Sequence, residues 1–138
     1  MNVDVLTLFP EWFDWMRRPR HLTNAARDAG LDIRCYSPRD HTPLGQGQVD
    51  DSPYGGGPGM VLRVDVMAAA MEAIYDMPAD RVKDTRRVVV LSPRGRPFTD
   101  AVAREFAALP DVTLMCGRYE GFDERVHEHL ANDCISLG

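Results

Sequence analysis

The chain has 138 residues, of which 44% are hydrophobic and 27% are charged, and its formal net charge is −5. A chain of this length suits one domain and is long enough to bury a core without a disulfide or a metal. No apolar run reaches the ~18 residues of a transmembrane helix, and the acidic balance gives no general support for nucleic-acid binding.

The three cysteines, Cys35, Cys116 and Cys134, are widely spaced and form no Cys-x-x-Cys pair. This usage, and a first segment without the regions of a secretory signal, predict a reduced, cytoplasmic protein. We expect each cysteine to be a small buried hydrophobe. His127 and His129 are two residues apart on a predicted helix and point away from each other, so we expect no metal site.

The first third of the chain predicts two strands with helical turns between them. Residues 3–8 read as a strand that starts the sheet, and residues 11–16 as a helical turn. Residues 22–29 read as a short helix that ends at Gly30. Residues 31–36 alternate apolar and polar side chains, which is typical of a strand with one wetter face near a sheet edge.

Residues 39–59 show no periodicity and contain the run Asp-Asp-Ser-Pro-Tyr-Gly-Gly-Gly-Pro-Gly. A loop of this length is uncommon in a compact domain and is usually functional or mobile. A flexible linker is one alternative, but the tyrosine, prolines and aspartates favour a shaped loop with several positive-φ positions. Because Met60 occupies the place of the third glycine, the run is not a dinucleotide-binding fingerprint.

The remaining residues alternate between helices and strands. Residues 63–76 predict a helix, residues 78–87 a polar surface connection, and residues 88–91 a parallel strand covered on both faces. Thr99 is the predicted N-cap of the next helix. The chain then continues with a central strand, a helix and a last strand, at residues 112–115, 122–130 and 133–137. This alternation predicts an α/β fold with a mostly parallel sheet flanked by helices.

Two predicted loops leave strands at their carboxyl ends, where ligands collect in open α/β sheets. They are residues 92–98 and residues 116–121. Glu120 lies between glycines, and because Asp123 and Glu124 already suit the start of the following helix, Glu120 is freer to face a ligand. The alternative is that Glu120 merely favours the positive end of that helix.

Arginines also mark these loops, namely Arg94, Arg96 and Arg118. Gathered at one edge they could hold a polyanion such as an RNA backbone. The alternative is scattered surface charge.

Four segments together resemble the bacterial tRNA (guanine-N1)-methyltransferases, the TrmD family of the SPOUT class. They are Val-Leu-Thr-Leu-Phe-Pro at 5–10, Asp-Asp-x-Pro-Tyr-Gly-Gly-Gly-Pro-Gly-Met at 50–60, Leu-Ser-Pro-x-Gly-x-x-Phe at 91–98 and Cys-Gly-Arg-Tyr-Glu-Gly-x-Asp-Glu-Arg-Val at 116–126. The resemblance covers the chain in order. It implies methylation of N1 of guanosine 37 in tRNA, with S-adenosyl-L-methionine as the methyl donor.

The resemblance also implies a deep trefoil knot and a homodimer. It places the cofactor against Leu91, Ser92, Pro93, Gly117, Tyr119, Glu120, Leu137 and Gly138. It places the target guanine and part of the cofactor against Asp50, Tyr54, Pro58 and Gly59. It further implies a supporting catalytic role for Glu120, and it assigns the carboxylate that takes the N1 proton to an aspartate of the family's C-terminal tRNA-binding domain.

The chain departs from the family pattern at Leu44 and Gln46, where the family usually has an aspartate and a histidine. The family's Gly-Asp-Tyr-Val-Leu-x-Gly-Gly-Glu segment does not follow Gly138. We therefore expect residues 1–138 to be a truncated N-terminal domain with an incomplete knot, inactive by itself. Two rival functions are a SPOUT methyltransferase for another RNA position and a non-catalytic RNA-binding module.

Overall fold

The computed structural model describes the backbone of residues 1–138 and every side chain except that of Arg17. The elements are, in chain order, β1 (Asn2–Leu6), η1 (Pro10–Arg17), α1 (Arg20–Ala29), β2 (Asp32–Tyr36), η2 (Pro38–Asp40), η3 (Gly45–Gly47), β3 (Asp50–Asp51), β4 (Val61–Leu62), α2 (Val64–Tyr75), α3 (Ala79–Thr85), β5 (Arg87–Pro97), α4 (Asp100–Ala107), β6 (Asp111–Cys116), η4 (Val126–Leu130) and β7 (Asp133–Ser136).

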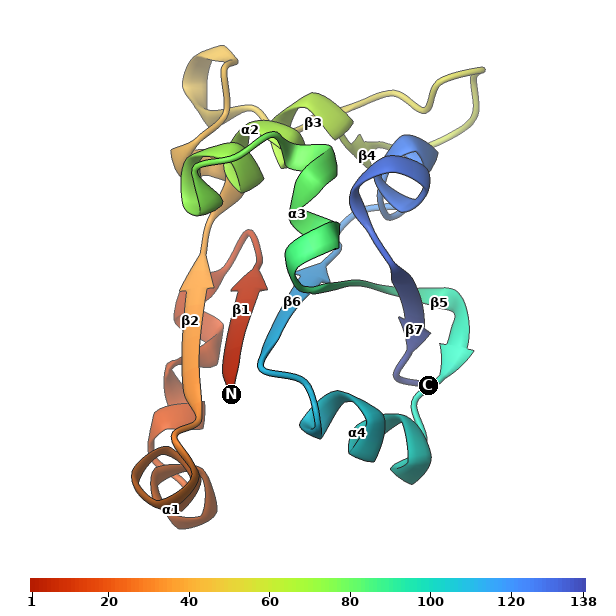
Figure 1. Cartoon of the computed structure of the whole chain (residues 1–138). Helices are drawn as coiled ribbons and strands as arrows, with labels where there is room; N and C mark the ends of the chain where they lie inside the picture. The colour runs from red at the N-terminus through yellow and green to blue at the C-terminus, as the bar shows by residue number, and fades with distance from the viewer.

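Across the described backbone, the main sheet has five strands in the order β2-β1-β6-β5-β7. Every neighbouring pair runs parallel, which confirms the predicted α/β fold with a parallel sheet (Figure 1). β2 lies at one edge, as its alternating side chains predicted. Because all five strands run the same way, their carboxyl ends share one edge of the sheet.

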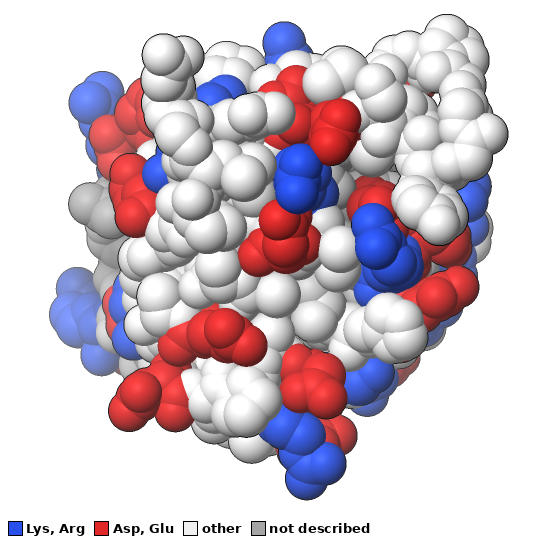
Figure 2. All heavy atoms as spheres, turned by 90° about the horizontal axis from the view of Figure 1, so that it is seen from above, with Lys and Arg blue, Asp and Glu red and all other residues white. Residues whose placement is uncertain are grey.

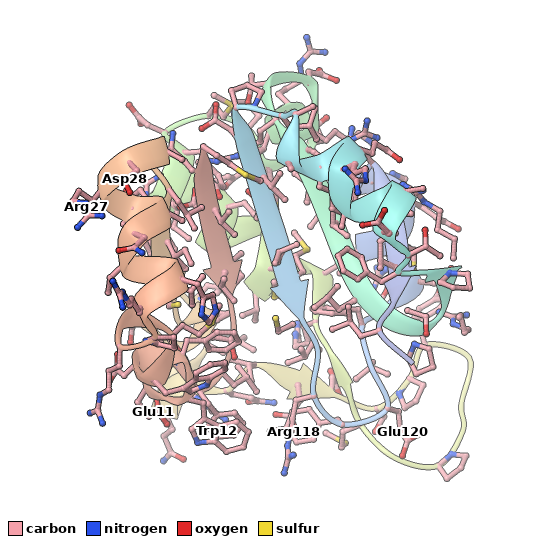
Figure 3. The ribbon with its side chains drawn as sticks, turned by 90° about the horizontal axis from the view of Figure 1, so that it is seen from below. Glu11, Trp12, Arg27, Asp28, Arg118 and Glu120 are labelled. Atoms are coloured by element: carbon pink, nitrogen blue, oxygen red, sulfur yellow. The ribbon has the colours of Figure 1, made fainter. Side chains whose placement is uncertain are left out.

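Helices cover both faces of this sheet. α2 and α3 lie on one face, and α1 and α4 lie on the other (Figures 1 and 3). The larger core cluster joins Leu6, Val88, Val90 and Met115 of the strands to α2, α3 and η4. The smaller one packs Val102 and Phe106 of α4 against Val89, Val112 and Ile135.

A polar cluster is buried beneath α2. The Asp4 carboxylate is fully buried and accepts hydrogen bonds from Arg34 Nε at 2.9 Å, Tyr75 Oη at 3.0 Å and Arg86 Nη1 at 2.7 Å. The hydroxyls of Tyr75 and Thr113 lie 2.7 Å apart. Burial raises the pKa of the Tyr75 phenol, so it stays protonated. We call these five residues the Asp4 network.

The prediction of a polar surface connection at residues 78–87 is wrong. α3 occupies most of this segment, and its Ala79 and Val82 are buried. These two apolar residues, three apart, give the helix one narrow inward stripe, while the charged residues between them stay on its outer side.

The prediction that residues 92–98 form an exit loop is also wrong, because β5 continues to Pro97. Its pairing with β7 slips in register between Leu91 and Arg96, which marks a bulge. At Gly95 a Cβ would lie 2.5 Å from the carbonyl carbon of Cys134, so only glycine fits this approach to β7. In place of the predicted loop, residues 92–95 form a bulge inside β5.

The predicted helix at residues 122–130 begins later than expected. Helical backbone starts at Glu124 and winds as a π-helix over η4. Phe122 instead forms a bridge with Leu62, which keeps that residue extended. Phe122, Val126 and Leu130 are all buried, so the apolar stripe is confirmed although the helix start is not.

Other expectations hold with small shifts. Gly30 ends α1 with a φ of 64°, and Thr99 caps α4 by accepting a hydrogen bond from Val102 N at 3.3 Å. β1 ends at Leu6, two residues earlier than predicted. The three cysteines are half-buried rather than buried, and no disulfide joins them. Among the described helices, none has the length and apolar character needed to cross a membrane.

Candidate active site

Neighbouring strands bring three chain segments to the carboxyl edge of the sheet. Leu91 of β5 pairs with Cys116 of β6 on one side and with Ile135 of β7 on the other. The bulge of residues 92–95 and the segments 117–121 and 137–138 therefore begin next to one another. This is the position in which ligands collect on parallel sheets.

The segment after β6, residues 117–121, turns tightly. Tyr119 has a φ of 59° and Gly121 a φ of 113°, both in the left-handed region. A Cβ on Gly117 would come within 3.0 Å of the Phe122 ring. A non-glycine residue with positive φ is uncommon and costs free energy, and such residues cluster at ligand sites.

The glycine-rich segment, residues 52–59, is joined to this turn through the backbone. Glu120 N donates to Met60 O at 3.0 Å, Leu62 N donates to Gly121 O at 2.9 Å, and Asp123 N donates to Leu62 O at 3.0 Å. On its other side, β4 pairs antiparallel with β3. We call β3, β4 and residues 120–123 the mini-sheet; it links two motifs that lie about sixty residues apart in the sequence.

Gly59 and Glu120 meet where these motifs touch. Gly59 has a φ of 88°, and a Cβ there would overlap Glu120 Cγ. The backbone conformation therefore favours glycine, and a Cβ at this position would push the Glu120 side chain aside. The Glu120 side chain is exposed, and among the described residues its carboxylate has no hydrogen-bond or ion-pair partner. It is open to solvent, and its role in binding a ligand stays a prediction.

An aromatic stack that the sequence did not predict lies along the same edge. Phe9 stacks on Trp12 with ring centroids 4.3 Å apart, and the Arg118 guanidinium lies 5.7 Å from the Phe9 ring. Figure 3 shows Glu11, Trp12, Arg118 and Glu120 along the edge toward which β1 and β6 point. The Phe-Pro motif at residues 9–10 was the only signal in the sequence for this contact.

The three arginines do not form the predicted cluster. Arg94 pairs with Glu124 at 2.8 Å, and Arg96 pairs with Asp133 at 2.6 Å. These pairings hold the carboxyl pKa values of Glu124 and Asp133 below their usual range. Of these three arginines, Arg118 alone has no carboxylate partner among the described residues. Figure 2 shows charges of both signs interspersed over the α2–α3 face. The ion pairs of Arg94 and Arg96 favour the alternative of scattered surface charge for these two residues.

The remaining predicted site residues fall into two groups. Leu91, Ser92, Pro93, Gly117, Tyr119, Leu137 and Gly138 all lie on the segments that meet at the carboxyl edge. Asp50, Tyr54, Pro58 and Gly59 lie on the mini-sheet or on the glycine-rich segment that it holds. Gly59 directly contacts Glu120 of the first group, whereas Tyr54 lies against Arg125.

Two arginines that the sequence reasoning missed flank the glycine-rich segment. Arg63 pairs with Asp51 at 2.9 Å and with Asp65 at 2.8 Å. Arg125 lies 5.4 Å from the centroid of the Tyr54 ring. Both arginines line a hollow of about 260 Å³, and Arg125 and Tyr54 also line a second one of about 390 Å³. The motif at residues 116–126 contained Arg125, but nothing local indicated its partner.

Burial shifts the pKa values of one cysteine and one histidine near this edge. Burial raises the pKa of Cys116, at the end of β6, to about 11, so its thiol stays protonated at neutral pH. Burial lowers the pKa of His127, whose ring packs edge-on against Phe122. Among the described side chains, no group of His, Cys, Asp or Glu could hold a metal ion.

Comparison with known proteins gives a consistent result over the whole chain. The profile of the family described as tRNA (Guanine-1)-methyltransferase TrmD matches residues 1–138. The chain is 45% identical to a tRNA (guanine-N(1)-)-methyltransferase of Geobacter metallireducens and covers 54% of it. It is 45% identical to the protein of the same name from Stenotrophomonas maltophilia, of which it covers 53%.

A third relative of that name, from Nitratidesulfovibrio vulgaris, is 42% identical, with 31% of its length covered. Each of these matches covers 100% of this chain. The chain thus spans about half the length, or less, of the curated relatives that it matches. The family match and the arrangement of its motifs at one edge of the sheet agree, and the chain belongs to the tRNA (guanine-1)-methyltransferase TrmD family.

Proposed function

We propose that residues 1–138 form the N-terminal cofactor-binding domain of an enzyme that methylates N1 of guanosine 37 in tRNA, with S-adenosyl-L-methionine as donor. One observation carries this proposal. The mini-sheet brings Gly59 against Glu120 at the carboxyl edge of the sheet, where the bulge of residues 92–95 and residues 137–138 also lie. Residues of both motifs can therefore contact one ligand together.

The residues at this edge suit the cofactor. Leu91 is half-buried and presents an apolar wall, while Leu137 is 67% exposed and open to a ligand. Backbone groups near Gly117 and Gly138, which carry no Cβ, allow the close approach that adenine and ribose need. Leu91, Ser92, Pro93, Gly117, Tyr119, Leu137 and Gly138 would hold it. When bound, the cofactor supplies a methyl carbon activated by its sulfonium.

The side chains around Gly59 suit the guanine. Guanine carries two adjacent donors, N1–H and the N2 amino group, and an ionised carboxylate such as Glu120 could accept from the N2 amino group, which leaves N1–H to the general base. Glu120 would fix the base so that N1 faces the methyl carbon, which is positioning work. Asp50, Tyr54, Pro58 and Gly59 would shape the surrounding walls. N1 would bond to the methyl carbon as the bond from that carbon to the cofactor's sulfur breaks and leaves a neutral thioether, and the N1 proton would pass to a carboxylate acting as general base; we assign that base to the family's C-terminal domain.

The trefoil knot and the homodimer belong to the same proposal. The sheet order, with β5 between β6 and β7, is compatible with a knotted carboxyl edge. The net charge is −5, and the α2–α3 face in Figure 2 carries charges of both signs, so this face offers no broad basic surface to tRNA. A second subunit and the family's tRNA-binding domain would supply the remaining contacts.

The test uses the full-length protein, S-adenosyl-L-methionine and tRNA transcripts with guanosine or adenosine at position 37. We expect N1-methylguanosine at position 37 of the first transcript and no methylation of the second, as mapped by nucleoside mass spectrometry. Methylation at another position would support a different SPOUT methyltransferase. An intact protein that binds tRNA but not the cofactor would indicate a non-catalytic RNA-binding module.

A further inference from the structure

Tyr54 lies in the glycine-rich segment and is 91% exposed. The residues after it give the segment little local rigidity, because Gly55, Gly56, Gly57 and Gly59 all have positive φ values and glycine permits many conformations. The Tyr54 ring nevertheless has a partner, since the Arg125 guanidinium carbon lies 5.4 Å from its centroid. A cation within about 6 Å of an aromatic ring is attracted by the face of the ring.

Arg125 is itself held firmly. Its Nε and Nη2 donate to the two carboxylate oxygens of Asp123 at 2.9 and 2.8 Å, and its backbone N donates to Asp123 Oδ1 at 3.0 Å. This two-point pairing fixes the plane of the guanidinium. Asp123 N in turn donates to Leu62 O at 3.0 Å, so Arg125 is fixed to the mini-sheet.

The start of the glycine-rich segment is held in a similar way. Arg63 Nη1 donates to Asp51 at 2.9 Å, while Arg63 Nε and Nη2 are paired with Asp65. The end of the segment is held where Gly59 meets Glu120. Between these two ends, the Tyr54–Arg125 contact is the link that joins the segment to the chain after β6.

We propose that Arg125 is a positioning residue, which docks Tyr54 and thereby sets the place of residues 52–59 relative to Glu120. The inference rests on the proposed function, in which this segment shapes the guanine pocket. Loss of the contact frees the segment in the unbound enzyme, and tRNA binding must then restrain it again. We expect KM for tRNA to rise about two- to five-fold, since exposed cation–π contacts are weak. The affinity for S-adenosyl-L-methionine should change less than KM for tRNA, because most of the residues proposed to hold it lie on the bulge of residues 92–95 and on residues 117–119 and 137–138.

A purely structural role, in which Arg125 serves only Asp123, predicts a different result. The docking role and the purely structural role are distinguished by a double-mutant cycle in the full-length protein, with the variants Arg125→Gln, Tyr54→Leu and the double variant. If Arg125 acts through Tyr54, Arg125→Gln raises KM for tRNA in the parent enzyme and has little effect when Tyr54 is already leucine. If it serves only Asp123, Arg125→Gln has the same effect in both backgrounds, which would overturn the proposal.

A spectroscopic reading does not depend on methyl transfer. In protein labelled with 3-fluorotyrosine, the ¹⁹F resonance of Tyr54 is assigned by its disappearance in Tyr54→Phe. It should shift in Arg125→Gln and, by a smaller amount, in Arg125→Lys, which keeps a charge opposite Asp123. It should not move in the matched control Arg104→Gln, which removes another exposed, paired arginine on α4. An unchanged Tyr54 resonance in Arg125→Gln would refute the docking, whereas failure of the proposed function would leave this result standing.

Discussion

The Asp4 network and the carboxyl edge place carboxylates in opposite situations. Asp4 is fully buried, and three donors surround its two oxygens. Glu120 is exposed and has no partner among the described side chains. A buried charge must be paired if the fold is to be stable, whereas a carboxylate that binds a ligand must stay open to it. The charge of Asp4 is thus compensated within the fold, whereas the charge of Glu120 stays open to solvent.

The backbone shows the same contrast. The Asp4 network is built mainly on regular strands and on α2, whereas the carboxyl edge contains left-handed backbone at Gly59, Tyr119 and Gly121. At Tyr119, which is not a glycine, this conformation costs free energy and persists only where the surrounding structure holds it. Here the adjoining mini-sheet holds it. Mutations in the network should therefore change stability, and mutations at the edge should change activity.

The largest effect is expected for Asp4→Ala. The substitution leaves Arg86, whose side chain is 8% exposed, without its closest carboxylate. Breaking a buried pair in this way lowers the free energy of unfolding by about 3–5 kcal/mol. Urea denaturation measures the change.

The matched control is Asp28→Ala, which removes an aspartate from the exposed Arg27–Asp28 pair on α1. It should alter the free energy of unfolding by no more than about 0.5 kcal/mol. Equal losses in the two variants would mean that the Asp4 network is not a main source of stability.

Gly59→Ala should break the carboxyl edge without unfolding the protein. The new Cβ overlaps Glu120 and displaces its carboxylate. We expect kcat/KM for tRNA methylation by the full-length enzyme to fall about a hundredfold, because misplacing a positioned group by about 1 Å can lower the rate by this factor. Gly55→Ala carries a similar backbone strain, with a φ of 93°, but its Cβ meets open space. Similar losses in both variants would show that backbone strain, rather than contact with Glu120, is responsible.

Gly95→Ala tests whether the bulge of β5 holds β7 in place. Its Cβ would lie 2.5 Å from backbone atoms of Cys134 and Ile135, so the strands must separate. The expected loss is about 1–3 kcal/mol in the free energy of unfolding. Gly45→Ala, where a Cβ meets open space, serves as the control. A thermal melt in which both variants match the parent protein would contradict the account of this bulge.

The smallest effect is expected for Tyr75→Phe. It removes the hydroxyl that contacts Thr113 and Asp4, while Asp4 keeps its two arginine partners. The free energy of unfolding should fall by about 1 kcal/mol. Tyr36→Phe is the control. If it lowers the free energy of unfolding as much as Tyr75→Phe does, the Tyr75 hydroxyl does not stabilise the protein through the Asp4 network.

Local patterns in the sequence were sufficient to predict most of the fold. Continuous or alternating apolar residues predicted the strands that became β1, β2, β5, β6 and β7, and helical periodicity predicted α2. α3 was missed because two buried residues give too short a pattern. The extension of β5 was missed because β5 resumes its pairing with β7 after a bulge, and no local sequence pattern predicts that it does so.

The candidate site was only partly predictable, for a physical reason. Glu120 stood out because it lies between glycines after a strand. Its contact with Gly59 depends on β4, which hydrogen-bonds to both β3 and the segment after β6. Pairing between distant segments depends on the folded backbone, so neither this contact nor the Tyr54–Arg125 pair left a local signal in the sequence.

The most direct test of the central claim is hydrogen exchange of the full-length protein with and without S-adenosyl-L-methionine. If the segments at the carboxyl edge hold the methyl donor, its addition should slow exchange at residues 91–95, 117–121 and 136–138. Exchange in α3, residues Ala79–Thr85, should stay unchanged. Protection that appears around α3 and the Asp4 network, with none at the carboxyl edge, would contradict the account.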